Sequence, residues 1–214
     1  MKKALITGAS SGLGREIGSL LSERQCKVVN LSRSESDFED IKADLSEDIS
    51  EAIATIKSDH PDIDLIIMNA GSMPLAEVGN IGFDVDKLFR VNVTGSIKII
   101  DSLMDLIKTN ETDIIFVGST ASFKGSHEHS VYCATKHALE GFIKSLRIEL
   151  RDYAVRVIGF HPGGFNSNLR GGLMKEGYMD PKELADLLMN IIELPKSMEV
   201  SNIVINRNKH PVRY

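Results

Sequence analysis

The sequence contains no tryptophan and only two cysteines, Cys26 and Cys133, among its 214 residues. Two isolated cysteines match neither a disulfide framework nor the paired spacing of a zinc site, and a reduced, cytoplasmic setting fits this usage best. No apolar run approaches the roughly 20 residues that a membrane helix needs, and no apolar h-region follows the two lysines near the N-terminus. The sequence therefore predicts neither a membrane segment nor a secretory signal.

Strong positive charge is also missing. The formal net charge is −5, and no basic cluster is longer than two residues. Binding to nucleic acid usually needs a basic face, so that class of partner is disfavoured. Any anionic ligand has to be held by local groups, because the overall field of the protein repels it.

The residues that are present suit an ordinary globular protein, with 42% hydrophobic and 26% charged side chains. The length is that of one domain over residues 1–214. Runs rich in valine and isoleucine predict strands at 3–7, 27–31, 64–69, 113–119, 156–161 and 202–206, with a weaker one at 41–43. Helical spacing predicts helices at 13–24, 50–59, 85–108, 132–153 and 181–193. This alternation predicts a doubly wound α/β fold, with a mostly parallel seven-stranded sheet and helices on both faces.

A glycine-rich turn, "TGASSGLG", joins the first predicted strand to the first predicted helix. Glycines at Gly8, Gly12 and Gly14 permit a tight turn and a close approach of the backbone to a pyrophosphate. The helix N-terminus then offers free N–H groups and the positive end of its dipole. The context is that of a Rossmann-type dinucleotide site, although the spacing differs from G-x-G-x-x-G. A glycine-rich turn without a ligand is the alternative.

The segment "VYCATKHALEGF" places Tyr132 and Lys136 four residues apart in a predicted helix. Residues at this spacing share one helix face. A nearby cation favours the phenolate and lowers the pKa of a tyrosine from its ordinary value of about 10. The pair fits a tuned acid/base, but Y-x-x-x-K is also a common string, so chance remains the alternative.

Taken together, these motifs resemble those of the short-chain dehydrogenases/reductases. Thr7 to Gly14 looks like the cofactor motif of that family, Asn69-Ala70-Gly71 matches its N-A-G, and Tyr132 and Lys136 match Y-x-x-x-K. Ser119 stands at the expected spacing before Tyr132, and Asn92 matches the helix asparagine of the family. The resemblance implies that the following residues contact the cofactor: Gly8, Ser10, Ser11, Gly12, Leu13, Gly14, Arg33, Asp44, Leu45, Asn69, Ala70, Gly71, Tyr132, Lys136, Pro162, Gly163 and Ser167.

The resemblance also implies four catalytic residues. Tyr132 would transfer a proton to or from the substrate oxygen, and Lys136 would lower the pKa of Tyr132 and bind the nicotinamide ribose. Ser119 would stabilise the substrate oxygen, and Asn92 would hold a water that links Lys136 to solvent. Without the resemblance, Ser119 reads as a capping residue at a strand end and Asn92 as a helix asparagine that makes a backbone bond.

The end of the second predicted strand favours NADP over NAD. An NAD enzyme usually carries an acidic residue there for the ribose 2′-hydroxyl, whereas this chain has Ser32 followed by Arg33. An arginine suits a 2′-phosphate, although a surface arginine is the alternative. Ser11 departs from the basic residue of many NADP-using relatives, and whether Arg15 compensates is not readable from the sequence.

Two segments are shorter than the resemblance implies. Only ten residues separate Arg33 from Asp44, so the helix usually found there is expected to be missing or reduced to a turn. The C-terminal part holds a glycine-rich loop at 163–180 and then a single helix, which indicates a small lid and an open substrate pocket. The segment "SHEHS" (126–130) contains plausible metal ligands, but the third ligand is not at a matching spacing, so no metal is expected.

The favoured interpretation is an NADP(H)-dependent oxidoreductase for a small carbonyl or alcohol substrate. A non-catalytic NADP-binding sensor or scaffold on the same fold is the alternative, and a sugar-nucleotide epimerase is disfavoured by length and glycine spacing. The face of the predicted helix at 132–153 that lies opposite Tyr132 and Lys136 carries the small residues Ala134, Ala138, Gly141 and Ser145. Such a face would let a second copy approach closely, which predicts a homodimer or homotetramer.

Overall fold

A computed structural model describes residues 1–167 and 177–208, and its centre is a seven-stranded sheet in the order β3-β2-β1-β4-β5-β6-β7. Every pairing is parallel, so the predicted doubly wound sheet is confirmed, with no antiparallel strand among the described residues. The strands are β1 (Lys3–Thr7), β2 (Lys27–Ser32), β3 (Glu39–Lys42), β4 (Leu65–Met68), β5 (Asp113–Val117), β6 (Val157–Pro162) and β7 (Asn202–Ile205). The chain runs outward from β1 through β2 to β3 and then returns to β4, so the strand order reverses between the neighbours β1 and β4.

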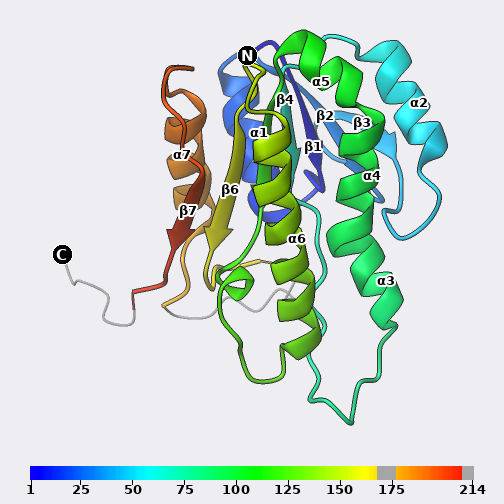
Figure 1. Ribbon diagram of the computed structural model, residues 1–214, viewed down its shortest axis with the longest axis vertical. Coiled ribbons are helices and arrows are strands. Elements are labelled where there is room, and N and C mark those ends of the chain that lie inside the picture. The colour runs from blue at the N-terminus through cyan, green and yellow to red at the C-terminus, as the bar shows by residue number, and fades with distance from the viewer. Residues whose placement is uncertain (168–176, 209–214) are drawn as a thin grey trace.

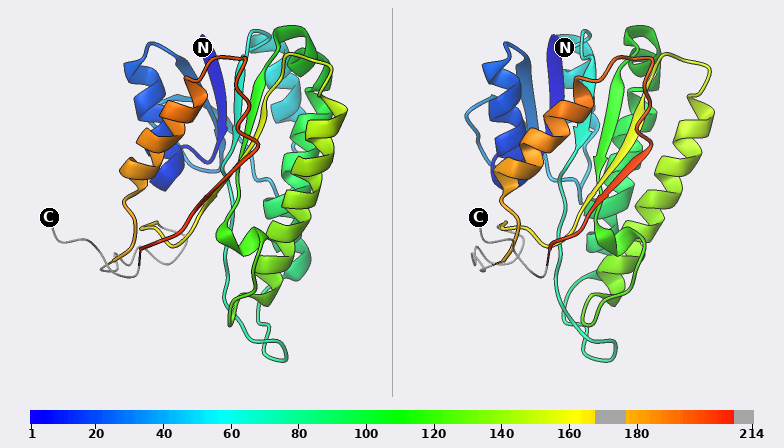
Figure 2. Two further views of the ribbon diagram at one scale, coloured as in Figure 1. Left: turned by 60° about the vertical axis from the view of Figure 1, so that its left-hand side comes forward. Right: turned by 90° about the vertical axis from the view of Figure 1, so that its left-hand side faces the viewer.

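Helices cover both faces of this sheet, as Figures 1 and 2 show. The helices α1 (Gly12–Glu23) and α7 (Pro181–Ile192) pack together on one face. The other face carries α2 (Ser50–Asp59), α4 (Gly95–Ser102), α5 (Met104–Asn110) and α6 (Ser130–Glu149). The central strands β1, β4 and β5 are buried along their whole length, because both of their faces contact helices.

The single helix predicted over 85–108 is interrupted. The short α3 (Val85–Phe89) runs into a π-helical turn at Arg90–Thr94, and the chain breaks again at Leu103 between α4 and α5. The apolar spacing did not reveal the second break, because Ile99, Leu103 and Ile107 all remain buried across it. One-turn π-helices occur frequently at functional sites, and this one contains Asn92.

No helix lies between β2 and β3, as the short spacing predicted. Instead, a polar turn closes the connection. The carboxylate of Asp40 accepts hydrogen bonds from the backbone N–H of Ser36 (2.9 Å), the hydroxyl of Ser36 (2.6 Å) and the side-chain amide of Asn30 (2.7 Å). This end of the sheet is therefore more open than a complete helical crossover would leave it.

Candidate active site

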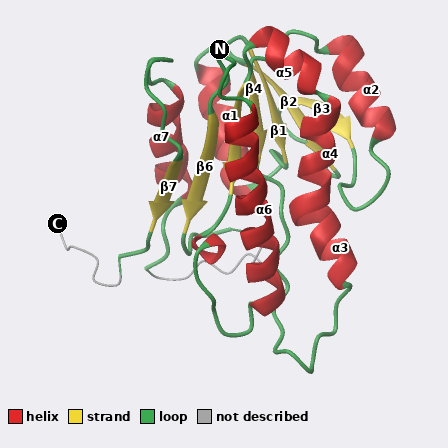
Figure 3. Ribbon diagram, in the orientation of Figure 1, coloured by secondary structure: helices red, strands yellow, loops and turns green. Residues whose placement is uncertain are grey.

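Two adjoining cavities lie at the carboxyl ends of the strands, where the arrowheads point in Figure 3. The larger has a volume of about 680 Å³ and begins at the β1–α1 turn, and the smaller has a volume of about 320 Å³ and begins at the ends of β5 and β6. Met73, Phe165 and Ser167 line both cavities. Ligands of parallel α/β sheets bind at this edge, where the strand order reverses.

The glycine-rich turn forms the wall of the larger cavity. Gly8 and Gly12 have positive φ angles of 72° and 56°, which a residue with a side chain adopts only under strain. A side chain at Gly12 would meet nothing within 4 Å and would project into open space, whereas one at Gly14 would overlap the carbonyl of Gly8. The first turn of α1 contains no acidic residue, and Ser11 at its N-cap makes no side-chain cap bond. The first N–H groups of a helix have no acceptor within the helix, and at this cavity wall they fit a diphosphate group.

Two polar side chains hold this turn in place: Thr7, a motif residue to which the sequence analysis gave no separate role, and Asn30, which it did not single out. The Oγ1 of Thr7 accepts hydrogen bonds from the backbone N–H groups of Asn69 (2.9 Å) and Ala70 (3.0 Å). The buried Asn30 accepts one from the N–H of Ala9 (2.8 Å). An asparagine inside the apolar strand "KVVNLS" was the available signal for the second, because a buried polar side chain requires partners. The Asn69 side-chain amide in turn donates to the carbonyl of Gly8 (3.1 Å).

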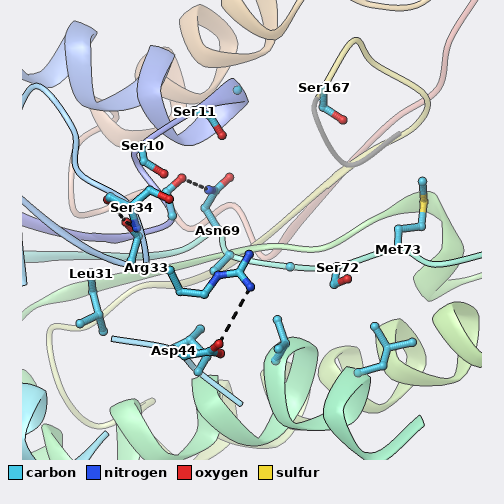
Figure 4. Close-up of a pocket in the computed structure, with 18 of the residues that line it drawn as sticks. Ser10, Ser11, Leu31, Arg33, Ser34, Asp44, Asn69, Ser72, Met73 and Ser167 are labelled. Atoms are coloured by element: carbon cyan, nitrogen blue, oxygen red, sulfur yellow. Dashed lines mark hydrogen bonds and ion pairs between the residues drawn. The ribbon is translucent and has the colours of Figure 1, made fainter. Parts of the chain in front are cut away.

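Arg33 and Asp44 both line the larger cavity, and the side chain of Arg33 extends toward Asp44, as Figure 4 shows. Their Nη1 and Oδ2 atoms are 3.9 Å apart, and the side chain of Arg33 is 73% exposed. Burial acts to raise the pKa of Asp44, but hydrogen bonds from Ser46 and the charges of Arg33 and Lys87 hold it below its usual range. Arg15 does not line this cavity. Its Nε lies 4.0 Å from a carboxylate oxygen of Asp37.

The smaller cavity brings together Ser119, Tyr132 and Lys136. Ser119 caps the one-turn helix η2 (Thr120–Ser122), and its Oγ accepts from the N–H of Ala121 (3.1 Å), a bond that leaves the hydroxyl proton unused. Tyr132 and Lys136 are 8% and 4% exposed on α6, and the Nζ of Lys136 lies 5.8 Å from the centre of the tyrosine ring. These three side chains reach the cavity from the end of β5 and the first turns of α6.

Lys136 lines the smaller cavity and lies close to the wall of the larger one. Its Nζ donates to the carbonyl of Val117 (3.2 Å), and it would lie 3.9 Å from a side chain added at Gly71, which lines the larger cavity. Burial lowers the pKa of Lys136 to about 8. This value results because a buried ammonium loses its hydration, and it leaves the side chain mostly protonated at neutral pH.

Asn92 lies behind the cavities and lines neither of them. Its Oδ1 accepts from the N–H of Ser72 (2.8 Å), and its Nδ2 donates to the carbonyl of Ser72 (2.9 Å) and to the hydroxyl of Thr135 (3.1 Å). The π-helical turn places the side chain so that it ties the loop after β4 to α6. The bonds to Ser72 are of the kind expected for a buried helix asparagine that satisfies backbone groups.

Comparison with known proteins agrees with this geometry. The family profile described as short chain dehydrogenase matches residues 2–176. The chain belongs to the short-chain dehydrogenase/reductase family. It is thus an enzyme of the NAD(P)-dependent oxidoreductases.

Among its relatives, this dehydrogenase/reductase is 30% identical over 217 residues to a cis-2,3-dihydrobiphenyl-2,3-diol dehydrogenase of Pseudomonas putida, an alignment that covers 91% of this chain and 78% of that protein. The structure of an alcohol dehydrogenase from Thermococcus sibiricus, complexed with 5-hydroxy-NADP, has a TM-score of 0.88 at 22% identity and full coverage of both chains. A 3-ketoacyl-(acyl-carrier-protein) reductase from Brucella melitensis, complexed with NADH, has a TM-score of 0.86 at 24% identity, with 97% and 98% coverage. At these identities the solved structures establish the fold.

Most residues that the sequence singled out lie at the two cavities of this dehydrogenase/reductase. The larger is lined by Gly8, Ser10, Ser11, Gly12, Leu13, Arg33, Asp44, Leu45, Asn69, Ala70 and Gly71, and the smaller by Ser119, Tyr132, Lys136, Pro162 and Gly163. Gly14 and Asn92 line neither cavity. Gly14 packs against the carbonyl of Gly8, and Asn92 accepts a hydrogen bond from the N–H of Ser72. Part of the predicted loop at 163–180 lies outside the described residues.

The histidines of the segment 126–130 take part in other contacts. The Nε2 of His127 lies 3.0 Å from a carboxylate oxygen of Glu77, and the ring of His129 packs edge-on against that of Tyr132. Within residues 1–167 and 177–208, no group of three potential ligands is arranged to hold a metal ion. Over the same ranges, none of the helices has the length and apolar character needed to cross a bilayer.

Proposed function

We propose that this chain is an NADP(H)-dependent carbonyl reductase or alcohol dehydrogenase, with residues 1–214 acting as one catalytic domain. The observation that carries the proposal is that Ser119, Tyr132 and Lys136 line one cavity, which shares residues with the cavity of the glycine-rich turn. A catalytic acid/base beside a nucleotide site is the arrangement that hydride transfer to a carbonyl requires.

Each polar group of the smaller cavity has a distinct task. A nicotinamide, when bound, would supply or accept the hydride. Tyr132 donates its phenolic proton to the substrate oxygen in reduction and removes it in oxidation. Ser119 donates its hydroxyl proton to the same oxygen and stabilises developing negative charge. Lys136 places a positive charge 5.8 Å from the centre of the phenol ring, which favours the phenolate, and its remaining N–H groups would hold the ribose hydroxyls of the cofactor.

Asn92 supports this site through the loop at Gly71 and Ser72. Its side-chain donors are both used by Ser72 and Thr135, so the side chain can hold a relay water only through the second lone pair of its oxygen. We assign the water between Lys136 and solvent to that lone pair or to the backbone of the π-helical turn.

The preference for NADP(H) rests on the far end of the larger cavity. Arg33 is at the cavity wall with Ser32 and Ser34 beside it, and the acid paired with it there is Asp44. The guanidinium of Arg33 and the hydroxyl of Ser34 form a donor set for a 2′-phosphate, whereas the hydroxyl of Ser32 already donates to the carbonyl of Ser34 (2.6 Å). Asp44 already neutralises part of the charge of Arg33, so NADP(H) has to displace or share that ion pair.

The assembly that we propose is a homodimer or homotetramer formed through α6. Ala134, Ala138, Gly141 and Ser145 are all exposed on the outer face of this helix, while Leu139, Ile143 and Leu146 are buried on its inner face. A solvated helix face more often carries lysine and glutamate. The small side chains allow a second helix to approach closely.

The direct test follows NADPH oxidation with a panel of aldehydes, ketones, diketones and quinones, comparing the parent with Tyr132→Phe. The parent should turn over at least one compound, and Tyr132→Phe should lose turnover while NADPH binding stays nearly intact, because only one hydroxyl is removed. A Tyr132→Phe variant with near-parental turnover would remove the assignment of the acid. Tight NADPH binding without turnover of any compound would favour the sensor or scaffold class.

A further inference from the structure

The charges around the smaller cavity are of one sign. Two lysines, Lys124 and Lys136, line it together with the imidazole of His129, and the described residues add no aspartate or glutamate to its wall. The formal net charge of the whole chain is −5, so the composition alone would favour acids over bases at such a wall. The cavity therefore attracts an anion locally, although the overall field of the protein repels it.

The two lysines differ in what their side chains bind. Lys136 is buried and donates to the carbonyl of Val117 (3.2 Å), and its charge and remaining donors are assigned above to Tyr132 and the cofactor. Lys124 is exposed, and its side chain makes neither an ion pair nor a hydrogen bond with any residue that the structure describes. The ammonium of Lys124 is therefore available to a ligand of this cavity.

Two hydroxyl groups extend the donor set beside Lys124. Thr120 lies in η2 and Ser126 two positions after Lys124, and both line the same cavity. Within the described part of the chain, neither hydroxyl has a hydrogen-bond partner. An ammonium and hydroxyls are donors that a carboxylate accepts from, and bonds to a charged group are roughly twice as strong as neutral ones. One free ammonium also matches the single charge of a carboxylate better than the higher charge of a phosphate monoester.

The acidic side chains of the neighbouring loops do not compensate Lys124. The Oε1 of Glu77 lies 3.0 Å from the Nε2 of His127, and Glu128 is exposed and lines neither cavity. The backbone N–H of Ala76 donates to the carbonyl of Glu128 (3.0 Å). This bond holds the loop between η2 and α6 against the loop after β4, so the wall that carries Lys124 is fixed by the fold.

The donor wall lies close to the catalytic groups. Lys124, Ser126 and His129 belong to the loop that leads from η2 into α6 (Figure 1). The ring centre of His129 is 6.4 Å from that of Tyr132. The cavity volume of about 320 Å³ is at the lower end of the range for small-molecule sites. A ligand that reaches both Tyr132 and this wall is therefore short, with only a few bonds between its anionic group and its reacting carbon.

We propose that the substrate of this site is a short oxo acid or the corresponding hydroxy acid, and that Lys124 selects it by binding its carboxylate. This inference rests on the proposed function, because it names the substrate class of the same cavity. In reduction the carbonyl carbon would accept a hydride from NADPH and the carbonyl oxygen a proton from Tyr132. The oxo acid then becomes a hydroxy acid, NADPH becomes NADP⁺, solvent returns the proton to Tyr132, and the carboxylate is unchanged.

The test compares substrates that differ only in the charged group: acetoacetate with acetoacetamide, and pyruvate with pyruvamide. In the parent, kcat/KM with NADPH should be at least about tenfold higher for the acid of one pair, the scale of a hydrogen bond to a charged group. Lys124→Met should remove most of this preference by raising KM for the acid. Lys124→Arg keeps the charge and should retain the preference.

The matched control is Lys98→Met, the same substitution at an exposed position of α4 that lines neither cavity. It should keep the parental ratio of acid to amide. If the parent reduces neutral aldehydes or ketones but prefers neither acid to its amide, the substrate class is wrong while the proposed function stands. A ratio in Lys124→Met equal to that of the parent, or a loss confined to kcat, would likewise overturn the role of Lys124.

A binding measurement separates this inference from the proposed function. If the parent binds NADPH but turns over no compound, the proposed function fails, and titration calorimetry of 3-hydroxybutyrate into the complex with NADPH decides the carboxylate site. This pair cannot react, because both partners are already reduced. Binding that weakens about tenfold or more in Lys124→Met and not in Lys98→Met supports the site, whereas no binding, or equal binding in the parent and Lys124→Met, overturns it.

Discussion

Replacing Lys136 with methionine should make the protein more stable at neutral pH while impairing its activity. Lys136 is 4% exposed, and burial lowers its pKa from 10.5 to about 8. Keeping the side chain charged in the fold at pH 7 therefore costs about 3 kcal/mol relative to the unfolded chain, at about 1.4 kcal/mol per pKa unit. Loss of the bond to the carbonyl of Val117 offsets about 1–2 kcal/mol of the gain. The expected net increase in the free energy of unfolding is about 1–2 kcal/mol.

The sign of the pH dependence distinguishes this cause from better packing. The pKa of Lys136 is lower in the folded than in the unfolded state, so the unfolded chain binds more protons between about pH 8 and 10.5. Parental stability should therefore gain from this group as the pH rises through that window, and the advantage of Lys136→Met should disappear near pH 10.

Urea unfolding at pH 7, 8, 9 and 10, without cofactor, measures the effect. Cofactor has to be omitted because its binding would stabilise the parent selectively. Lys98→Met, the same substitution at an exposed position of α4, is the matched control and should change stability by less than about 0.5 kcal/mol. Lys136→Met should also weaken NADPH binding and reduce turnover, since the lysine has roles in both. A variant less stable than the parent at pH 7, or a difference that is constant from pH 7 to 10, would refute the reasoning.

Three further predictions concern the cofactor, the loop after β4 and the assembly. Arg33→Ala should weaken NADPH binding by about 1.5 kcal/mol, or roughly tenfold, and leave NADH binding unchanged. Fluorescence titration measures both affinities, and equal affinity of the parent for NADPH and NADH would contradict the proposed preference for NADP(H). Asn92→Ala leaves the backbone groups of Ser72 without their partner and should lower the free energy of unfolding by about 2–3 kcal/mol, and a loss below about 0.5 kcal/mol would show that these bonds contribute little. Ala138→Arg should convert the oligomer to monomer in sedimentation at micromolar concentration, and a parent that is already monomeric would count against the proposed interface.

The sequence alone determined the order of strands and helices in this protein. Strand and helix periods are local, so the runs around Leu65–Met68 and the stripe of α6 could be recognised without knowledge of their neighbours. The missing helix between β2 and β3 also followed from a local count of residues. The glycine-rich turn and the pair Tyr132 and Lys136 were found for the same reason, because each motif lies within one element or one junction.

Only the tertiary structure decided what surrounds these motifs. The burial of Lys136, the bonds of Asn92 to Ser72 and the meeting of Glu140 with His161 all join segments that are distant in sequence. Even the break at Leu103 was invisible to the apolar pattern, which continues through it. These contacts depend on how the crossovers place β4 beside β1 and pack α6 over β5 and β6. A buried polar group needs a hydrogen-bond partner, and at these contacts the partner comes from a segment that is distant in sequence, so the neighbours along the chain do not reveal it.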